Sequence, residues 1–87
     1  MLVTRNASSR QELDVRGRTI EEAIPTVDKG IDDALLAGLP ELRIIHGKGT
    51  GALRAGLTAY LSAHRAVKRL ELASLHEGGA GATVIYL

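Results

Sequence analysis

A long amphipathic segment between two short apolar runs restricts the fold more than any other feature of this chain. Within residues 19–38, apolar side chains recur every three or four positions, as they do along one face of a helix. These positions are Ile20, Ala23, Ile24, Val27, Ile31, Ala34 and Leu35. The flanking runs Glu12–Val15 and Leu42–Ile45 have the length and pattern of strands. A strand–helix–strand order predicts parallel pairing of the two strands with a right-handed crossover.

The predicted helix has clear start and stop signals. Thr19 followed by Glu22 is a capping-box pattern, in which each side chain accepts a hydrogen bond from the other residue's backbone N–H. Gly38 and then Pro40 end the helix, because glycine favours the left-handed cap and proline cannot continue the helix. Pro25 conflicts with a regular helix, since it lacks an N–H in the second turn, and we expect a kink or a later start there.

The remaining sequence adds a second helix and two strands. The helix follows a glycine-rich loop, and its apolar stripe consists of Leu53, Leu57, Tyr60 and Leu61. Val67–Ala73 and Thr83–Leu87 are predicted strands, near enough in sequence to pair antiparallel, and the last is apolar enough to be buried on both faces. The predicted fold class is α/β: a two-layer β-α-β-α-β-β sandwich, with a four-stranded mixed sheet and two helices on one face.

Length and composition limit the domain content and exclude several classes of protein. The 87 residues hold one domain, which we place at 12–87, after a polar, flexible arm or linker at 1–11. Tyr60 and Tyr86 are the only aromatic residues, which argues against recognition of nucleic acid by base stacking. The absence of cysteine excludes disulfides and thiolate zinc sites. Without a long apolar run or a signal peptide, we expect a soluble, cytoplasmic protein that does not contact a membrane.

The loop His46–Gly51 has the composition of a phosphate-binding turn and lies in a basic half of the chain. Although the net charge is only +1, residues 42–87 contain six basic and two acidic side chains. Glycines let the backbone approach a ligand, the helix that follows offers N–H groups and its positive dipole end, and Lys48 adds a charge. A tight strand-to-helix turn without a ligand is the alternative interpretation.

Two other phosphate-binding loops fit less well. Lys48 and Thr50 do not have the spacing of a Walker A loop. Gly47, Gly49 and Ala52 match the dinucleotide-binding pattern Gly-x-Gly-x-x-Gly/Ala, but the chain is too short for two mononucleotide-binding halves. Neither pattern therefore predicts the ligand.

Polar residues at the ends of the first two strands form the predicted site. If these strands end at one edge of the sheet, Asp14, Arg16, His46 and Lys48 converge where open α/β sheets bind ligands. In phosphodiester hydrolysis, Arg16 and Lys48 would hold the phosphate, and His46 or Asp14 would transfer a proton or position water. We predict catalytic roles for Asp14, Arg16 and His46, although a turn-capping Asp and a packed His are the simpler interpretations of each residue alone. The predicted contacts to nucleic-acid phosphate are Arg16, Arg18, Gly47, Lys48, Gly49, Thr50 and Arg54.

The sequence does not define a metal site. His76 and Glu77, with Asp14 and His46, have metal-ligating atoms, but their spacing matches no known site. No cofactor is therefore predicted, and Mg²⁺ or Mn²⁺ is the ion to consider if hydrolysis needs one. His64 is predicted to interact with the dipole at the end of the second helix.

Three motifs, LDVRG (13–17), HGKGTG (46–51) and GGAGATVIYL (78–87), resemble those of the Smr (small MutS-related) domain. That family has an LDLHG- or LDLRG-like start, an HGxG loop and a closing Gly-x-Gly-x-Thr segment. The stretch DDALLAGLPELRIIHGKGTGALR is most similar to the branch at the C-terminus of the second bacterial MutS family. Asp14 matches the motif's acid, and His46, Gly47, Lys48 and Gly49 match the loop. Arg16 stands where many relatives have His, and because Arg cannot act as an acid or base at ordinary pH, its implied role is phosphate binding.

The resemblance implies a DNA-nicking endonuclease module that acts on branched or duplex DNA. It also implies an N-terminal MutS-like ATPase in the parent chain, which suppresses homologous recombination, and a fold similar to the C-terminal domain of the third bacterial translation initiation factor. Three alternatives stay open: a nucleic-acid- or ribosome-binding module without chemistry, an RNA endonuclease that acts at stalled ribosomes, and a domain that only mediates protein contacts.

Overall fold

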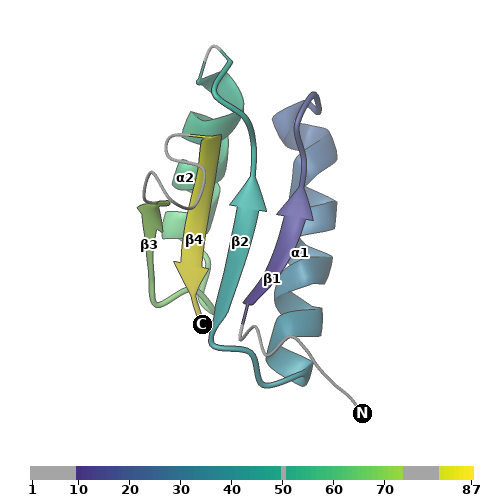
Figure 1. Cartoon of the computed structure of the whole chain (residues 1–87), viewed down its shortest axis with the longest axis vertical. Coiled ribbons are helices and arrows are strands. Elements are labelled where there is room, and N and C mark those ends of the chain that lie inside the picture. Colours follow the sequence, from purple (N-terminus) through teal and green to yellow (C-terminus); the bar gives the residue numbers. More distant parts are fainter. Residues whose placement is uncertain (1–9, 50, 74–80) are drawn as a thin grey trace.

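The computed structural model describes residues 10–49, 51–73 and 81–87, which form the predicted β-α-β-α-β-β order. The elements are β1 (Arg10–Asp14), α1 (Ile20–Leu36), β2 (Glu41–Ile45), α2 (Ala52–Ser62), β3 (Arg69–Leu72) and β4 (Ala82–Tyr86). Both helices lie on the same face of one sheet (Figure 1), so the predicted two-layer α/β fold class is confirmed. None of the helices in the described part is long and apolar enough to cross a membrane.

The sheet is mixed and has the strand order β1-β2-β4-β3. β1 and β2 are parallel, whereas β4 is antiparallel to both β2 and β3. β4 lies between two strands, so both of its edges are paired, and its residues Ala82, Thr83, Val84 and Ile85 are all buried. The parallel pairing of the first two strands, the antiparallel pairing of the last two and the burial of β4 are confirmed.

The bounds of all four strands differ from the predicted ones, by one residue at most for β2 and β4 and by more for β1 and β3. β1 begins at Arg10, within the segment predicted to be a flexible arm, because Arg10 already pairs in register with Glu41 of β2. Residues 1–9 of that arm lie outside the described residues. β3 is shorter than predicted, since the N–H of Val67 donates to the carbonyl of His64 in the turn after α2 instead of joining the sheet.

α1 begins with the predicted capping box. The hydroxyl of Thr19 accepts from the N–H of Glu22 at 3.2 Å, and the carboxylate of Glu22 accepts from the N–H of Thr19 at 2.9 Å. The later start expected from Pro25 is wrong, because the helix runs continuously from Ile20 through Pro25. Pro25 is exposed, so water can reach the carbonyl that loses its helical donor there.

The main core lies between the helices and the sheet and is entirely aliphatic at its centre. Gly30 of α1 faces Leu13 of β1 so closely that a Cβ atom at Gly30 would lie 2.3 Å from Leu13 Cδ1. Leu35 was expected on the apolar face but is 48% exposed, because the last turn of α1 extends past the ends of the strands (Figure 1). The buried core residues are Val15, Ala23, Val27, Ile31, Leu42, Ile44, Leu57, Leu61 and Ile85.

We expect Thr19→Ala to lower the free energy of unfolding by about 1 kcal/mol, because it removes the hydroxyl that caps α1. For a domain of this size, the melting temperature should fall by roughly 4–8 °C in a circular-dichroism melt. Thr58→Ala is the matched control, since Thr58 is exposed inside α2, where alanine favours the helix. Equal melting temperatures for the two variants would show that the cap contributes nothing.

Candidate functional site

The ends of β1 and β2 bring the first two motifs together at one edge of the sheet. Asp14 is the register partner of Ile45, and the N–H of Val15 donates to the carbonyl of Ile45 at 2.9 Å. The turn that contains Arg16 therefore leaves the sheet beside the loop that begins at His46. The prediction that the first two motifs lie together at one edge of the sheet is confirmed.

The third motif completes this arrangement through the start of β4. The carbonyl oxygen of Gly81 accepts from the N–H groups of both His46 and Gly47, at 3.0 and 2.9 Å. A Cβ atom at Gly81 would lie 3.6 Å from Lys48 Cγ, so the two segments are in direct contact. Sequence reasoning treated the closing segment only as a family signature and did not foresee that it supports the loop. Residues 78–80 of the motif lie outside the described residues.

His46 is buried, with 5% of its surface exposed, and both of its ring nitrogens are hydrogen-bonded within the domain. Nδ1 lies 2.9 Å from the carbonyl oxygen of Gly47, and Nε2 lies 2.8 Å from the hydroxyl oxygen of Thr83. Because a carbonyl can only accept, Nδ1 carries the proton, and Nε2 of the neutral ring accepts from the hydroxyl of Thr83. This geometry fixes one tautomer and ties the loop to β4. Thr83 was not predicted as a site residue, although it is the closing Thr of the third motif.

Asp14 and Arg16 form a two-pronged ion pair on the surface beside the loop. Arg16 Nη2 donates to Asp14 Oδ2 at 2.6 Å, Arg16 Nε donates to Oδ1 at 3.0 Å, and the Arg16 N–H donates to Oδ1 at 3.1 Å. The side-chain hydrogen bonds from Arg16 lower the pKa of Asp14 from 3.8 to about 2. The same contact raises the pKa of Arg16, so both groups stay charged at neutral pH. Asp14 is therefore a weak base that is suited to accepting hydrogen bonds.

The loop backbone turns sharply beside this ion pair. Gly47 has a φ of 80°, a left-handed conformation that glycine adopts without strain. A Cβ atom at Gly47 would lie 3.4 Å from Arg16 Cγ, so the side chain of Arg16 lies directly over the loop. Gly47 thus serves both the turn and the close approach of the first motif.

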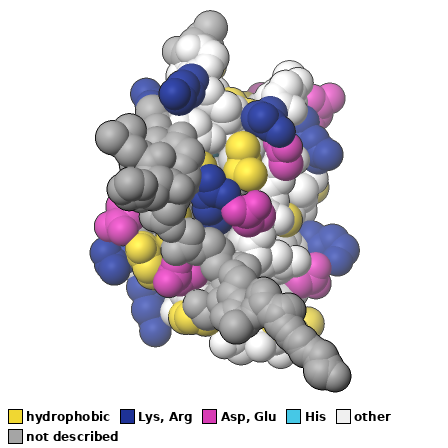
Figure 2. All heavy atoms as spheres, in the orientation of Figure 1, with side chains coloured by type: hydrophobic (Ala, Val, Ile, Leu, Met, Phe, Trp, Pro, Cys, Tyr) yellow, Lys and Arg dark blue, Asp and Glu magenta, His cyan; other side chains and the backbone are white. Residues whose placement is uncertain are grey.

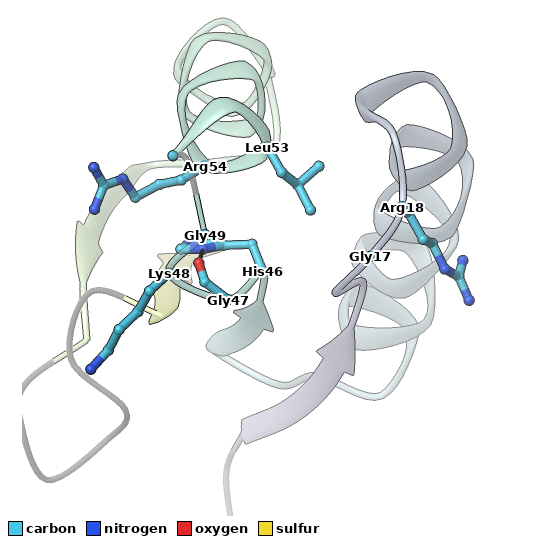
Figure 3. Close-up of a pocket in the computed structure, with 9 residues that line it drawn as sticks. Gly17, Arg18, His46, Gly47, Lys48, Gly49, Leu53 and Arg54 are labelled. Carbon is cyan, nitrogen blue, oxygen red and sulfur yellow. Dashed lines mark hydrogen bonds between the residues drawn. The ribbon is translucent and has the colours of Figure 1, made fainter.

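A cavity of about 170 Å³ opens between the loop and the start of α2 (Figure 3). Among the described residues that line it, none is acidic and three are cationic. Backbone groups of the loop glycines form part of the wall, so an anion is the ligand class that this cavity favours. The lining consists of Gly17, Arg18, His46, Gly47, Lys48, Gly49, Gly51, Leu53 and Arg54.

The predicted phosphate contacts at the rim of this cavity point in different directions. Arg18 Nη1 donates to the hydroxyl of Thr26 on α1 at 2.7 Å, and the Arg18 side chain extends away from the loop in Figure 3. Arg54 arises from the first turn of α2 and lies over Gly51, where a Cβ atom would be 3.5 Å from Arg54 Nη2. Thr50, also a predicted contact, lies outside the described residues.

The described residues at this edge do not fit a divalent metal ion. Both carboxylate oxygens of Asp14 accept from Arg16, so an ion could bind there only after displacing the guanidinium. Among the described residues, no three His, Cys, Asp or Glu side chains lie close enough together to hold a metal. His76 and Glu77 lie outside the described residues.

His64 contacts α1 as well as the end of α2, where the sequence placed it. His64 Nδ1 accepts from the N–H of Ala66 at 3.1 Å, which leaves Nε2 facing Asp28 Oδ1 at 3.5 Å. Tyr60 donates its hydroxyl to the same Asp28 carboxylate at 2.7 Å, and this contact raises the pKa of Tyr60. The cluster joins the two helices away from the loop.

Comparison with known proteins identifies the family. Residues 13–87 match the Smr domain family, and the chain belongs to it. The chain is 52% identical over 80 residues to Endonuclease MutS2 of Listeria innocua, and 52% identical over 82 residues to Endonuclease MutS2 of Finegoldia magna. These alignments cover 92% and 94% of the chain but 10% of each relative, so the chain spans about a tenth of their length.

Two solved structures agree with this assignment. The Smr domain of Thermus thermophilus MutS2 matches with a TM-score of 0.85 at 43% identity, over 88% of this chain and 96% of that chain. YdaL, a stand-alone small MutS-related protein from Escherichia coli, matches with a TM-score of 0.80 at 30% identity, over 87% of this chain and 63% of that chain. The resemblance to the Smr domain, and to its branch in the second bacterial MutS family, is confirmed.

We expect Arg16→Gln to raise the pKa of Asp14 towards 3.8, because the side-chain hydrogen bonds that lower it are lost. The folded-state pKa of Asp14 lies below its unfolded value, so the ion pair stabilises the domain above about pH 4 and stops doing so as pH falls through about 2. Carbonyl-carbon NMR titration of both proteins measures the shift. An Asp14 pKa that is equal in the two proteins would rule out the ion pair as its cause.

We expect Thr83→Val to lower the free energy of unfolding by about 1–3 kcal/mol, because His46 Nε2 would be buried without a partner. Thr83→Ser is the control, since it keeps the hydroxyl but loses the methyl group. Urea unfolding should rank the wild type first, Ser second and Val last. The opposite order of the two variants would mean that Thr83 acts through its packing alone.

Proposed function

We propose that this domain binds the phosphates of a nucleic-acid strand at the loop and nicks DNA by hydrolysing a phosphodiester bond. The main support is the convergence of three motifs around Gly47 and Lys48, beside a cavity whose described lining is cationic and backbone and contains no acidic residue. By extension from the relatives named Endonuclease MutS2, the parent chain would contain an N-terminal MutS-like ATPase that restrains homologous recombination. Such a protein would act in the cytoplasm, at the nucleoid or at the ribosome.

The contrast between the two helix N-termini supports an anion at the loop. α1 has a complete capping box and two acidic residues in its first turn, Glu21 and Glu22. α2 begins at Gly51, which makes no side-chain cap hydrogen bond, and its first turn contains no acidic residue. The positive end of the α2 dipole is therefore not offset by a side chain of its own first turn, and it faces the cavity that Lys48 and Arg54 line.

In the proposed reaction, a water oxygen attacks phosphorus, the bond to one ester oxygen breaks, and a proton passes to that oxygen. Arg16 and Lys48 offset the charge that develops on the phosphoryl oxygens. Asp14, a carboxylate throughout the neutral range, accepts a hydrogen bond from the attacking water and orients it. His46 positions the loop through Gly47 and Thr83, and Nε2 can accept a proton from the attacking water only if the hydroxyl of Thr83 rotates away.

A binding module without chemistry is the second candidate, and one observation favours it. Both predicted proton carriers are engaged within the domain, Asp14 by Arg16 and His46 by Gly47 and Thr83. The related YdaL is a stand-alone protein, so a fold of this kind also exists outside long MutS-like chains. Binding to RNA or the ribosome, or cleavage of RNA at stalled ribosomes, is compatible with the same phosphate contacts.

We expect the domain to convert supercoiled plasmid to open circles, and Asp14→Asn to slow this nicking by about 10²–10⁴-fold. Agarose-gel time courses with Mg²⁺, with Mn²⁺ and with a chelator measure the rate and the metal requirement. Asp33→Asn is the matched control, because it breaks a different exposed ion pair, with Lys29 on α1, and should retain the wild-type rate.

The outcomes separate the two candidates. If the wild type fails to nick under every condition but shifts DNA in a gel, the binding module is the correct function. If Asp14→Asn and Asp33→Asn nick equally well, the nuclease stands but the role of Asp14 is wrong. A cleavage assay on a structured RNA, under the same metal conditions, shows whether the domain cuts RNA as well as DNA.

A further inference from the structure

A second cavity, of about 480 Å³, lies on the other side of the loop from the first. Its cationic lining residues are Arg16, Arg43 and Lys48, and Ile45 and Ala82 belong to the same lining. Gly47 and Lys48 border both cavities, so the loop is a ridge between them. Sequence reasoning assigned no role to Arg43.

The alternation of β2 places this cavity on the face of the sheet opposite the helices. Leu42 and Ile44 belong to the core beneath the helices, so Arg43 and Ile45 face the other way. Figure 2 views this face, where Lys and Arg side chains lie from its centre towards the end at which β1 and β2 finish. The cation-lined surface therefore continues from the loop onto the sheet.

Two acid–arginine pairs lie side by side at this cavity. Arg43 Nη1 pairs with Glu12, its register partner on β1, and Arg16 pairs with Asp14, two residues further along the same strand. A guanidinium has five N–H donors, so each arginine can bind a carboxylate and a phosphate together. Lys48 makes no hydrogen bond or ion pair with the described residues. Among the described residues at this cavity, three cations thus face two carboxylates, an excess of positive charge.

Arg43 is largely buried and paired at this position. Its side chain is only 15% exposed, although it lies on a sheet face that no described helix covers. An arginine whose side chain is already confined loses less conformational entropy when it binds an anion. None of the described residues that line the cavity is aromatic, which favours phosphate over a base as the ligand.

We propose that the second cavity binds a backbone phosphate of the same nucleic-acid strand, next to the phosphate held at the loop. The strand would cross the edge of the sheet over Gly47 and Lys48, with one phosphate on the α2 side and another at Arg43. This inference rests on the proposed nucleic-acid binding and adds to it the path of the strand. The contact is to phosphate alone and is therefore independent of base sequence.

Fluorescence anisotropy with a labelled single-stranded thymidine oligonucleotide, measured over a series of salt concentrations, tests the path. Losing one phosphate contact should lower the slope of log affinity against log salt by about 0.7, which corresponds to about fourfold weaker binding at 0.15 M salt. We expect this loss for Arg43→Gln and for Arg54→Gln, and twice the slope change for the double variant. Arg65→Gln is the control, because Arg65 is exposed beyond the far end of α2.

A second variant keeps the test valid if Arg43→Gln does not fold. Glu12→Gln removes the carboxylate that competes with phosphate for Arg43, so it should tighten binding. Asp32→Asn removes one negative charge from the exposed side of α1 and should leave the affinity unchanged. Melting curves of each variant identify any that fail to fold.

Each result has one meaning. Suppose that Arg54→Gln lowers the salt slope relative to the wild type, while Glu12→Gln and folded Arg43→Gln bind like their control variants. The second site is then wrong, and the proposed function stands. If the wild type shows no salt-dependent binding to DNA or RNA, the proposed function is wrong, and the strand path is overturned with it. Weaker binding by Arg43→Gln, or tighter binding by Glu12→Gln alone, supports the second site.

Discussion

The carbonyl oxygen of Gly81 is the hydrogen-bond acceptor on which the whole site depends. By accepting from the N–H groups of His46 and Gly47, it fixes where β2 ends and the loop begins. The His46 ring then spans from the Gly47 carbonyl to Thr83, so the loop is attached to β4 at backbone and side chain alike. Because β4 is also an inner strand next to β2, His46 and Gly47 are tied directly to the centre of the sheet. Support of this kind is what a site needs in order to hold its groups in a productive geometry.

The fold gives its two helix N-termini different roles. α1 satisfies its own first turn through Thr19 and Glu22, and so needs no ligand to begin. α2 begins at a glycine without a side-chain cap, directly after the loop, in the half of the domain that has most of the excess positive charge. Gly51 offers no side-chain cap, and the packing of Leu57 and Leu61 into the core holds α2 in place.

The sequence predicted the fold well because each element has a local signal. The capping box, the apolar spacing of α1 and the continuous apolar run of β4 are properties of neighbouring residues, and all were found in the structure. The site was only half predictable. Convergence of Asp14 and His46 follows from parallel strands, but the role of Thr83 depends on a side chain 37 residues from His46. Arg43 gave no signal, since a single cation within an apolar strand has no pattern, and its importance comes from the register that sets it against Glu12. Leu35 was wrongly predicted to be buried. It continues the apolar spacing of α1, but it is exposed because the helix extends past the end of the sheet.

The charges at the edge of the sheet also constrain how chemistry there can respond to pH. The pKa of Asp14 is lowered to about 2 and that of Arg16 is raised, so neither changes charge near neutrality. The electrostatic field that these two groups produce therefore stays the same throughout the neutral pH range. A change in nicking rate near neutral pH would therefore not report on Asp14 or Arg16.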